Sequence, residues 1–517
     1  MVKVFFGIPY ASPPIGDNRW CPPKPAKPWA PSVLQATKPP PGCYQHCDLP
    51  PYTCPDSVSE DCLYLTVFTP LTAVNGSKFP VMMFIHGGNF ITGSGYTELT
   101  DGRFMSNYTN TVTVFINYRL GAFGFLVAGT KSDAAIGNYG IMDQRAAMDW
   151  IQSNIEAFGG DPDKVTIFGQ SAGSQSVAIH LATDKSKHLF HRAIIESFPY
   201  SVPFKTPWEA VILGNDLADD LNCTHGDMKC LRSASPESVY AAQGQSGGVI
   251  INPLRLLEEF EPWGPVVDGK DITKQSVDSF MKGEYQDKPI MMGTTSDEAR
   301  IYIFGAFPDP ANIIQVYEFV LAVFPTHFFK VIEEYPPGPP GSDQREPLST
   351  AAHHFVFACP TRAALRGVAR HGNNKVWMYL YDHVMSFHKA WGPSWESMCT
   401  THVCHGAELP FVFHTATNGG YNYTPDELVL TDTMLYYWTN FAHTGNPNNG
   451  QTKKSATSYV HNRLQNWPEY SNSSNWSYMH FTTPSRVDKD YLSKKCDFWD
   501  TLDVYSRKYR ILHKSCQ

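Results

Sequence analysis

Three short runs of apolar residues in the first half of the chain have the pattern of buried strands. They cover residues 81–85, 112–117 and 165–168, and they are rich in β-branched or aromatic side chains. A half-exposed strand would alternate apolar with polar positions, whereas runs of this kind are typical of strands buried on both faces. We therefore predict strands over these three ranges.

Between and after these runs, the apolar residues follow helical spacing. From Gly140 to Phe158 they recur at intervals of three and four positions, and Gly159-Gly160 ends the pattern. The positions are Ala147, Trp150, Ile151, Ile155 and Phe158. Residues 172–182 also have the pattern of a helix. Strand and helix therefore alternate, which favours a parallel sheet covered by helices.

The rest of the chain is less regular. Its opening 60 residues are rich in proline and cysteine, so we expect loops held by cross-links. Residues 378–382 and 410–413 indicate further strands, and the proline- and glycine-rich stretch 335–341 indicates a surface loop. No repeat or long linker divides the sequence. We expect one domain over residues 1–517, with an α/β fold whose central sheet is mostly parallel and carries helices on both faces.

The composition excludes several classes of protein. Hydrophobic residues make up 42% of the chain and charged residues 17%, as in a globular protein, and the net charge of −8 lacks the basic field that nucleic-acid binding needs. No apolar run reaches the ~20 residues of a membrane span. There is no phosphate-binding loop or dinucleotide fingerprint, and His353-His354 has no further ligands near it in sequence. We expect no cofactor and no metal site.

One motif points to a nucleophile. Gly169-Gln170-Ser171-Ala172-Gly173 fits G-x-S-x-G, and it follows a predicted strand and opens a predicted helix. A nucleophile elbow needs this context, because the serine sits in a strained turn and small residues let strand and helix approach closely. Without the context the same letters would describe a turn of small residues. We predict Ser171 as the nucleophile.

A second motif predicts an oxyanion hole. His86-Gly87-Gly88-Asn89-Phe90 follows the predicted strand 81–85, and its small residues expose backbone N–H groups. Such groups can stabilise the negative charge of a tetrahedral intermediate. Together with the N–H of Ala172, we predict three donors, on Gly88, Asn89 and Ala172. A plain glycine-rich turn is the alternative.

Longer stretches around these motifs resemble one family. They are Ser59-Glu-Asp-Cys-Leu-Tyr-Leu65, Asn117-Tyr-Arg-Leu-Gly-Ala-Phe-Gly-Phe125, Gly137-Asn-Tyr-Gly-Ile-Met-Asp-Gln-Arg145 and Phe158-Gly-Gly-Asp-Pro162. Over nearly the whole chain the sequence resembles the type-B carboxylesterase/cholinesterase family, which implies the α/β-hydrolase fold. The family's N-terminal hairpin and signal peptide are missing, so we expect a truncated start.

The resemblance implies the other two members of a catalytic triad. The family's acid ends a Gly-x-x-x-Asp-Glu segment, here Gly293 to Glu298, and neighbouring Asp297 matches a structural residue. Its base begins the run His405-Gly-Ala-Glu-Leu-Pro-Phe-Val-Phe413. The order Ser171, Glu298, His405 is that of α/β-hydrolases. His402 is a weaker alternative as the base.

Several positions bear on the substrate. Gln170 replaces a glutamate that many members carry beside the nucleophile, and Ser197 matches a serine that hydrogen-bonds the acid. Phe204 and Tyr302 match acyl-pocket positions, which implies a modest apolar acyl group. Cholinesterases hold a quaternary ammonium on a tryptophan in the loop that here runs from Cys43 to Cys62. This loop contains no tryptophan, and Ile301 replaces an expected aromatic residue, so we expect poor activity on choline esters.

The chain contains twelve cysteines. The resemblance implies the disulfides Cys43–Cys62, Cys223–Cys230 and Cys359–Cys496. Proximity alone suggests Cys47–Cys54 and Cys399–Cys404, and the pairing of Cys21 and Cys516 is open. The resemblance also implies two buried ion pairs, Arg19–Glu60 and Arg119–Asp161, that support the scaffold.

Sequons and cysteines together favour the secretory pathway. N-x-S/T triplets begin at Asn75, Asn107, Asn222, Asn422, Asn472 and Asn475. The opening Met-Val-Lys-Val-Phe-Phe-Gly-Ile-Pro is too short for a signal peptide. Either the sequence lacks its true start or export uses another route. We expect a glycosylated protein of the secretory lumen or the exterior.

We therefore predict a serine hydrolase that cleaves small-molecule carboxylic esters through an acyl-enzyme. A homodimer is left open. The alternative is a non-catalytic protein on a cholinesterase-like fold, either an adhesion domain or a storage or crystal-forming protein, because fold does not imply function. Adhesion members of the family typically lose the serine or the histidine, whereas this chain keeps both.

Overall fold

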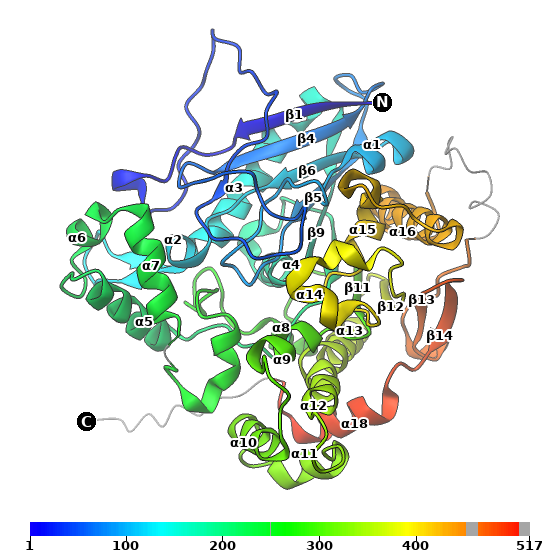
Figure 1. Cartoon of the computed structure of the whole chain (residues 1–517). Helices are drawn as coiled ribbons and strands as arrows, with labels where there is room; N and C mark the ends of the chain where they lie inside the picture. Colours follow the sequence, from blue (N-terminus) through cyan, green and yellow to red (C-terminus); the bar gives the residue numbers. More distant parts are fainter. Residues whose placement is uncertain (249, 451–463, 506–517) are drawn as a thin grey trace.

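A ten-stranded sheet forms the centre of the computed structural model, which describes residues 1–248, 250–450 and 464–505 (Figure 1). From β6 to β13 the neighbouring strands are parallel, and β1, β4 and β14 add antiparallel edges. In spatial order the strands are β1 (Val2–Pro9), β4 (Tyr64–Pro70), β6 (Val112–Ile116), β5 (Phe79–Ile85), β9 (Gly160–Gln170), β10 (Arg192–Glu196), β11 (Ile290–Thr295), β12 (Val376–Tyr381), β13 (Ser477–Phe481) and β14 (Arg486–Lys489).

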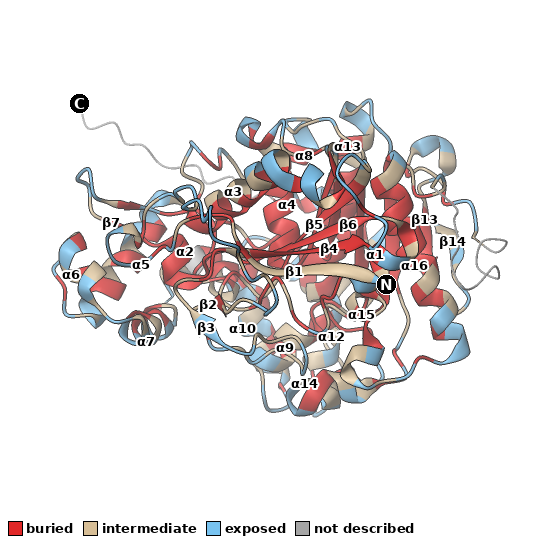
Figure 2. Ribbon diagram, turned by 90° about the horizontal axis from the view of Figure 1, so that it is seen from above, coloured by how far each residue is buried: buried red, intermediate tan, exposed pale blue. Residues whose placement is uncertain are grey.

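Helices cover both faces of the sheet. In chain order they are α1 (Arg103–Thr109), α2 (Gly121–Phe125), α3 (Tyr139–Asn154), α4 (Ala172–Ala182), α5 (Pro207–Asp220), α6 (Met228–Ser233), α7 (Pro236–Ser246), α8 (Ser276–Lys282), α9 (Arg300–Ala306), α10 (Ile313–Val323), α11 (Phe328–Glu334), α12 (Arg345–Ala352), α13 (Cys359–His371), α14 (Gly392–Cys399), α15 (Leu409–Phe413), α16 (Pro425–Thr444) and α18 (Ser493–Leu502). Figure 2 shows the buried strands between the helical layers.

Successive side chains of the central strands enter two different cores, as the pleat of a strand requires. On β5, Val81, Met83 and Ile85 pack with residues of α4 and α13, whereas Met82 and Phe84 pack with residues of α1, α15 and α16. Both faces are therefore apolar, which is why the strand sequence does not alternate. The prediction of a mostly parallel sheet with helices on both faces is confirmed.

Two local predictions were wrong. Residues 410–413, expected as a strand, belong to α15: Pro410 lies in its first turn, where the missing N–H costs nothing, and Val412 N–H donates to the Glu408 carbonyl at 2.9 Å. The opening residues were expected to be loops, but Val2–Pro9 forms β1, an edge strand that pairs with β4. The remaining strands and helices predicted from periodicity are present with bounds shifted by a few residues.

Five disulfides cross-link the described residues. They are Cys43–Cys62, Cys47–Cys54, Cys223–Cys230, Cys359–Cys496 and Cys399–Cys404, which covers the three pairs implied by the resemblance and the two suggested by proximity. Cys21 has no disulfide partner among the residues that the structure describes. Cys516 lies outside the described residues. Two of them, Cys43–Cys62 and Cys47–Cys54, cross-link the loop-rich region after β1, as its cysteine content predicts.

One of the two expected ion pairs, Arg19–Glu60, is present. Arg19 Nη2 lies 2.5 Å from Glu60 Oε2, and both side chains are almost buried. Arg119 does not pair with Asp161. Its guanidinium binds Asp143 on α3 through two bonds of 2.8 and 2.7 Å, because Asp143 is wholly buried beneath it. Asp161 instead lies near two lysines at the start of β9.

Two features of the described residues are relevant to the expected secretion, namely their helices and the exposure of the sequon asparagines. Among the described residues no helix is long and apolar enough to cross a membrane. All six sequon asparagines are exposed, so each is accessible to modification.

Candidate active site

Ser171 occupies the turn between β9 and α4. Its backbone angles are φ 59° and ψ −126°, which an L-residue adopts only under strain, and its N–H donates to the Glu196 carbonyl at 3.0 Å. Gly173 is required here, because a Cβ on it would collide with the Ile85 carbonyl of the neighbouring strand. The turn therefore presents the serine at the carboxyl end of the sheet, as in a nucleophile elbow.

His405 and Glu298 form a short, buried polar contact beside Ser171. His405 Nδ1 lies 2.5 Å from Glu298 Oε2, and the other carboxylate oxygen accepts from the Thr295 N–H at 2.6 Å. Glu298 is fully buried and His405 is 7% exposed. A buried carboxylate on Nδ1 fixes the imidazole orientation and leaves Nε2 facing the serine side of the site.

Asp297 joins the acid segment to the base segment. Its backbone N–H donates to the Val403 carbonyl at 3.1 Å, and its carboxylate accepts from the Val403 N–H at 3.0 Å. The Cys399–Cys404 disulfide closes the loop directly before His405. His402 points elsewhere, with Nδ1 3.6 Å from Asp297. The two segments are thus held together beside the triad, and Asp297 contacts backbone where Glu298 contacts the imidazole.

The nucleophile and the base do not hydrogen-bond each other in this structure. The Gln170 amide nitrogen lies 3.0 Å from His405 Nε2, and the Ser171 hydroxyl lies close to the phenol of Tyr302. Catalytic hydrogen bonds in ligand-free sites are often long and tighten only with substrate. For catalysis the Gln170 amide must leave Nε2 and the serine must turn toward it.

Gly88 and Asn89 line the same pocket as Ser171, and Ala172 follows Ser171 at the start of α4. Gly88 has φ +107°, and a Cβ there would collide with the Thr92 carbonyl, so only glycine fits. No described residue accepts a hydrogen bond from the N–H groups of Gly88, Asn89 or Ala172. Neighbouring His86 is buried, which lowers its pKa to about 4 and keeps it neutral.

Ser197 contacts a different acid from the one expected. Its hydroxyl donates to Glu408 Oε1 at 3.3 Å and does not reach Glu298, whose two oxygens are taken by Thr295 and His405. Burial, together with the charges of Glu298 and Glu196, raises the pKa of Glu408 well above its usual range. The Ser197 hydroxyl therefore serves Glu408 and not the acid that contacts His405.

Glu408 and Glu196 are site residues that the sequence reasoning missed. Glu196 is buried, accepts from the Trp438 indole at 2.5 Å, and has a pKa raised by burial to about 7. Both glutamates stand inside apolar runs of the sequence, Ile194-Ile195-Glu196 and Glu408-Leu409-Pro410-Phe411. A lone acid in an apolar run is the signal that could have marked them.

A pocket opens above Ser171, His405 and the Gly88 turn. The space between its lining atoms is about 1520 Å³, its open mouth included. Tyr52 of the cross-linked loop lines it, as do Trp391 and Trp395, two aromatic residues that the sequence did not single out. Among the described lining residues there is no aspartate, glutamate, lysine or arginine. The pocket therefore suits a neutral molecule.

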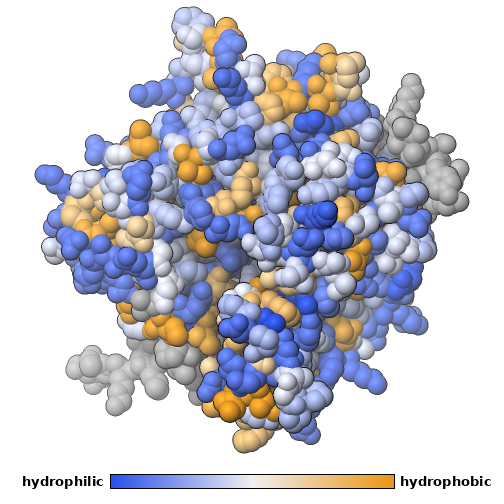
Figure 3. Space-filling model, in the orientation of Figure 1, coloured by the Kyte–Doolittle hydropathy of each residue, from blue (hydrophilic) through white to orange (hydrophobic). Residues whose placement is uncertain are grey.

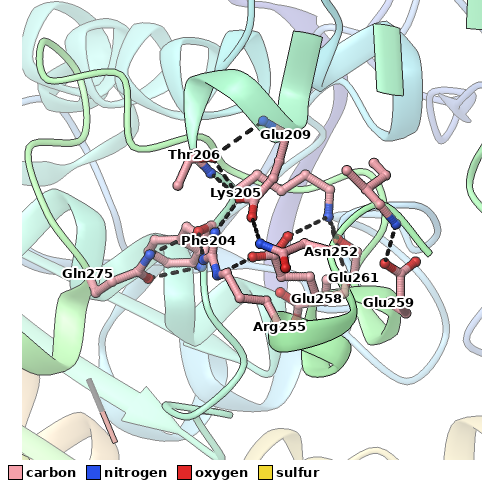
Figure 4. A network of polar contacts seen from close by, with 11 residues as sticks. Phe204, Lys205, Thr206, Glu209, Asn252, Arg255, Glu258, Glu259, Glu261 and Gln275 are labelled. Atoms are coloured by element: carbon pink, nitrogen blue, oxygen red, sulfur yellow. Dashed lines mark hydrogen bonds and ion pairs between the residues drawn. The ribbon is translucent and has the colours of Figure 1, made fainter. Parts of the chain in front are cut away.

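The two expected acyl-pocket residues are separated. Tyr302 lines the pocket, and its ring lies 5.5 Å from that of His405. Phe204 does not line it: the ring is buried in the core, and the backbone carbonyl accepts from Arg255 and Gln275 at 2.7 and 2.8 Å (Figure 4). These bonds hold the Phe204 segment away from the serine.

The histidine pair has a structural environment. His353 Nε2 lies 3.2 Å from the Tyr491 hydroxyl, and His354 Nδ1 lies 2.9 Å from the Tyr335 hydroxyl. No group of three or more potential metal ligands occurs among the described residues. The chemistry that the site offers is thus that of a serine, a histidine and a carboxylate beside backbone donors, which is suited to acyl transfer.

Comparison with known proteins agrees with this geometry. The model of the carboxylesterase family matches residues 1–499. The "Crystal protein" of Dictyostelium discoideum is 38% identical over 86% of this chain and 79% of its own length, and the "cAMP-regulated D2 protein" of the same organism is 37% identical over 87% and 82%. An acetylcholinesterase of Bungarus fasciatus is 33% identical over 96% of this chain and 82% of its own.

Proposed function

The chain belongs to the carboxylesterase family, and from that premise we propose that it hydrolyses small-molecule carboxylic esters through an acyl-enzyme on Ser171. The observation that carries the proposal is the buried contact of 2.5 Å between His405 and Glu298, next to a serine in a strained turn. Burial, backbone strain and a charge partner cluster at catalytic sites, and this combination supports the proposal.

The proposed reaction has two halves. His405 Nε2 takes the Ser171 proton as the serine oxygen attacks the ester carbonyl, and the N–H groups of Gly88, Asn89 and Ala172 stabilise the oxyanion. The intermediate collapses when His405 returns the proton to the leaving alcohol. Water then attacks the acyl-enzyme with His405 as base, which releases the acid and restores the serine. Glu298 stabilises the imidazolium in both halves.

The pocket supports a neutral ester. None of its described lining residues is an acid that could hold a quaternary ammonium, and the cross-linked loop contributes Tyr52 in place of a tryptophan. Apolar walls and Tyr302 favour an apolar acyl group. We propose secretion and glycosylation from the disulfides and the exposed sequons, and the single domain and the homodimer stay predictions.

A storage or crystal-forming role is the second candidate. It is favoured by one observation, the 38% identity to a protein named "Crystal protein". Such a role does not require the triad, but it does not exclude a working site either.

The test compares hydrolysis of 4-nitrophenyl butyrate by the wild-type protein and three alanine variants. Ser171→Ala and His405→Ala should each lower kcat by about 10³-fold or more, because triad members act as a unit. His402→Ala, a histidine three positions away, is the matched control and should stay within about threefold. Turnover that survives Ser171→Ala would refute the proposal, and a wild-type protein without any turnover would favour the storage role.

A further inference from the structure

Two pockets meet at Tyr302 and Asn89. The first is the pocket above Ser171, and the second lies on the other side of Tyr302; these two residues are the ones that line both. The second cavity has about 730 Å³ between its lining atoms, its open parts included. It thus adjoins the site of acyl transfer, with Tyr302 and Asn89 between the two spaces.

The second cavity is almost wholly apolar. Its walls come from η4 (Pro253–Phe260) and from α10, α11 and α12, and they include Leu257, Val320, Val331 and Ala352. Among the described lining residues, Glu261 alone carries an ionisable carboxyl or amino group. Its carboxylate accepts from Gln175 at 2.9 Å, and burial raises its pKa to about 7. A cavity of this composition suits hydrocarbon.

Tyr302 is the partition between the two spaces. Its ring is stacked against Phe357 at 6.0 Å and meets Phe260 edge-on at 6.3 Å, while its hydroxyl lies close to Ser171. Aromatic contacts and the neighbouring serine therefore set the position of this partition.

The wall that carries Leu257 and Phe260 is fixed by buried charges. Arg255 binds the carboxylates of Glu209 and Glu258, and the Lys205 ammonium faces the backbone carbonyls of Glu258 and Glu261 (Figure 4). These groups are buried, and breaking such a network is costly. The cavity on this side is therefore held open by a rigid wall.

The opposite wall is formed by α10 and α11. α10 is apolar toward the cavity, where Val320 is 5% exposed, and also toward solvent, where Ile314 and Leu321 are 63% and 52% exposed. Figure 3 shows apolar side chains gathered over these helices at the bottom of this face. Inward and outward positions on one helix thus offer matched sites for substitution.

We propose that the cavity behind Tyr302 receives the far end of a long unbranched acyl chain, which makes esters of medium- and long-chain acids the preferred substrates. The inference rests on the proposed esterase function and deepens its acyl preference. The carbonyl stays at Ser171 beside Asn89, and the chain passes the displaced Tyr302 into the apolar space. Each methylene that leaves water there raises kcat/KM by up to about fourfold, from about 0.8 kcal/mol per buried CH₂.

The first test is a chain-length series of 4-nitrophenyl esters from acetate to decanoate, kept at monomeric concentrations. For the wild-type protein, kcat/KM should rise about tenfold or more from butyrate to decanoate. Val320→Phe narrows the cavity and should lower the decanoate-to-butyrate ratio about tenfold. Leu321→Phe, the same ring on the outer face of α10, should leave the ratio unchanged.

The second test does not depend on turnover. Decanoic acid should bind the wild-type protein and Leu321→Phe equally in calorimetry, and it should bind Val320→Phe about tenfold more weakly. Ala352→Leu, a smaller filling of the same cavity, replaces Val320→Phe if that variant does not fold.

The outcomes separate this inference from the proposed function. The cavity assignment is overturned, and the esterase function stands, if two results occur together. The protein hydrolyses the butyrate ester but kcat/KM does not rise toward decanoate, and Val320→Phe does not change the affinity for decanoic acid. If no ester is hydrolysed but Val320→Phe still weakens the binding of decanoic acid, the cavity assignment stands and the proposed esterase function is overturned.

Discussion

Replacing Glu298 by glutamine separates the charge of the acid from its shape. The amide has the size of the carboxylate, so packing in this fully buried position is preserved. It cannot offset the positive imidazolium that forms when His405 takes the serine proton. It also favours the wrong tautomer if its NH₂ group faces Nδ1. We predict a large loss in kcat with little loss of folding.

The magnitude follows from the buried contact of 2.5 Å between Nδ1 and Oε2. With the two charges centred about 4 Å apart and an effective dielectric constant of about 20, their attraction is about 4 kcal/mol. At about 1.4 kcal/mol per factor of ten, this corresponds to about 10³-fold in rate. The amide replacement in the serine protease template costs about 10⁴-fold, so we expect a fall in kcat of about 10²–10⁴-fold.

The assay measures kcat on an aryl butyrate for Glu298→Gln and for Asp297→Asn at equal folded fraction, checked by thermal unfolding. The substitutions are adjacent and remove the same charge. Asp297 receives the Val403 N–H at 3.0 Å, so its loss should appear as a lower Tm and only a small change in kcat.

A general effect of negative charge would make the two variants alike. If Asp297→Asn lowers kcat more than Glu298→Gln, the acid is wrongly assigned by one residue. A Glu298→Gln variant within tenfold of the wild type would refute the electrostatic argument altogether.

Three further predictions concern substrate, pH and stability. Short aryl esters should have a higher kcat/KM than the matched choline esters, because no acidic side chain lines the described pocket. Glu261 has a pKa of about 7 in the folded protein against an ordinary 4.5, so the folded state binds more protons between these pH values. The free energy of unfolding should therefore fall as pH rises from about 4.5 to 7, by up to about 3 kcal/mol. Glu261→Gln should remove that part of the pH dependence in denaturant titrations. Arg119→Met should cost about 3–5 kcal/mol in the same titrations, because it leaves Asp143 buried without its partner.

Each of these has a contrary result. A preference for choline esters would assign cation binding to Trp391 and Trp395, which line the pocket. A Glu261→Gln protein whose slope between pH 4.5 and 7 equals that of the wild type would show that Glu261 is ionised throughout. An Arg119→Met protein as stable as Glu156→Gln, the loss of an exposed ion pair, would contradict the buried pairing with Asp143.

The local sequence was sufficient to predict the structure where one kind of interaction dominates. Strands β5 and β6 and the second half of β9 are buried on both faces, so their sequences are apolar throughout. Gly169 and Gly173 leave no room for a side chain, which marks the close turn around Ser171. The assignments of Glu298 and His405 needed the resemblance, because the two residues are 107 positions apart and only the fold brings them together.

The predictions failed where several partners compete. Asp143 and Asp161 are both buried acids that follow Arg119 in the sequence, and the fold brings Asp143 to its guanidinium and Asp161 to two lysines. Ser197 was expected to bond Glu298 but bonds Glu408, and the oxygens of Glu298 accept from Thr295 and His405. Such choices depend on which lone pair is free in the folded chain, and no sequence pattern records that.

The most direct test of the account is labelling with an organophosphate followed by intact-mass measurement and peptide mapping. An activated serine attacks phosphorus quickly, so we predict one adduct per chain, on Ser171, together with complete loss of ester hydrolysis. The His405→Ala variant should not react. Labelling at another serine, or none in a folded protein, would contradict the claim that Ser171 is the nucleophile of a working esterase.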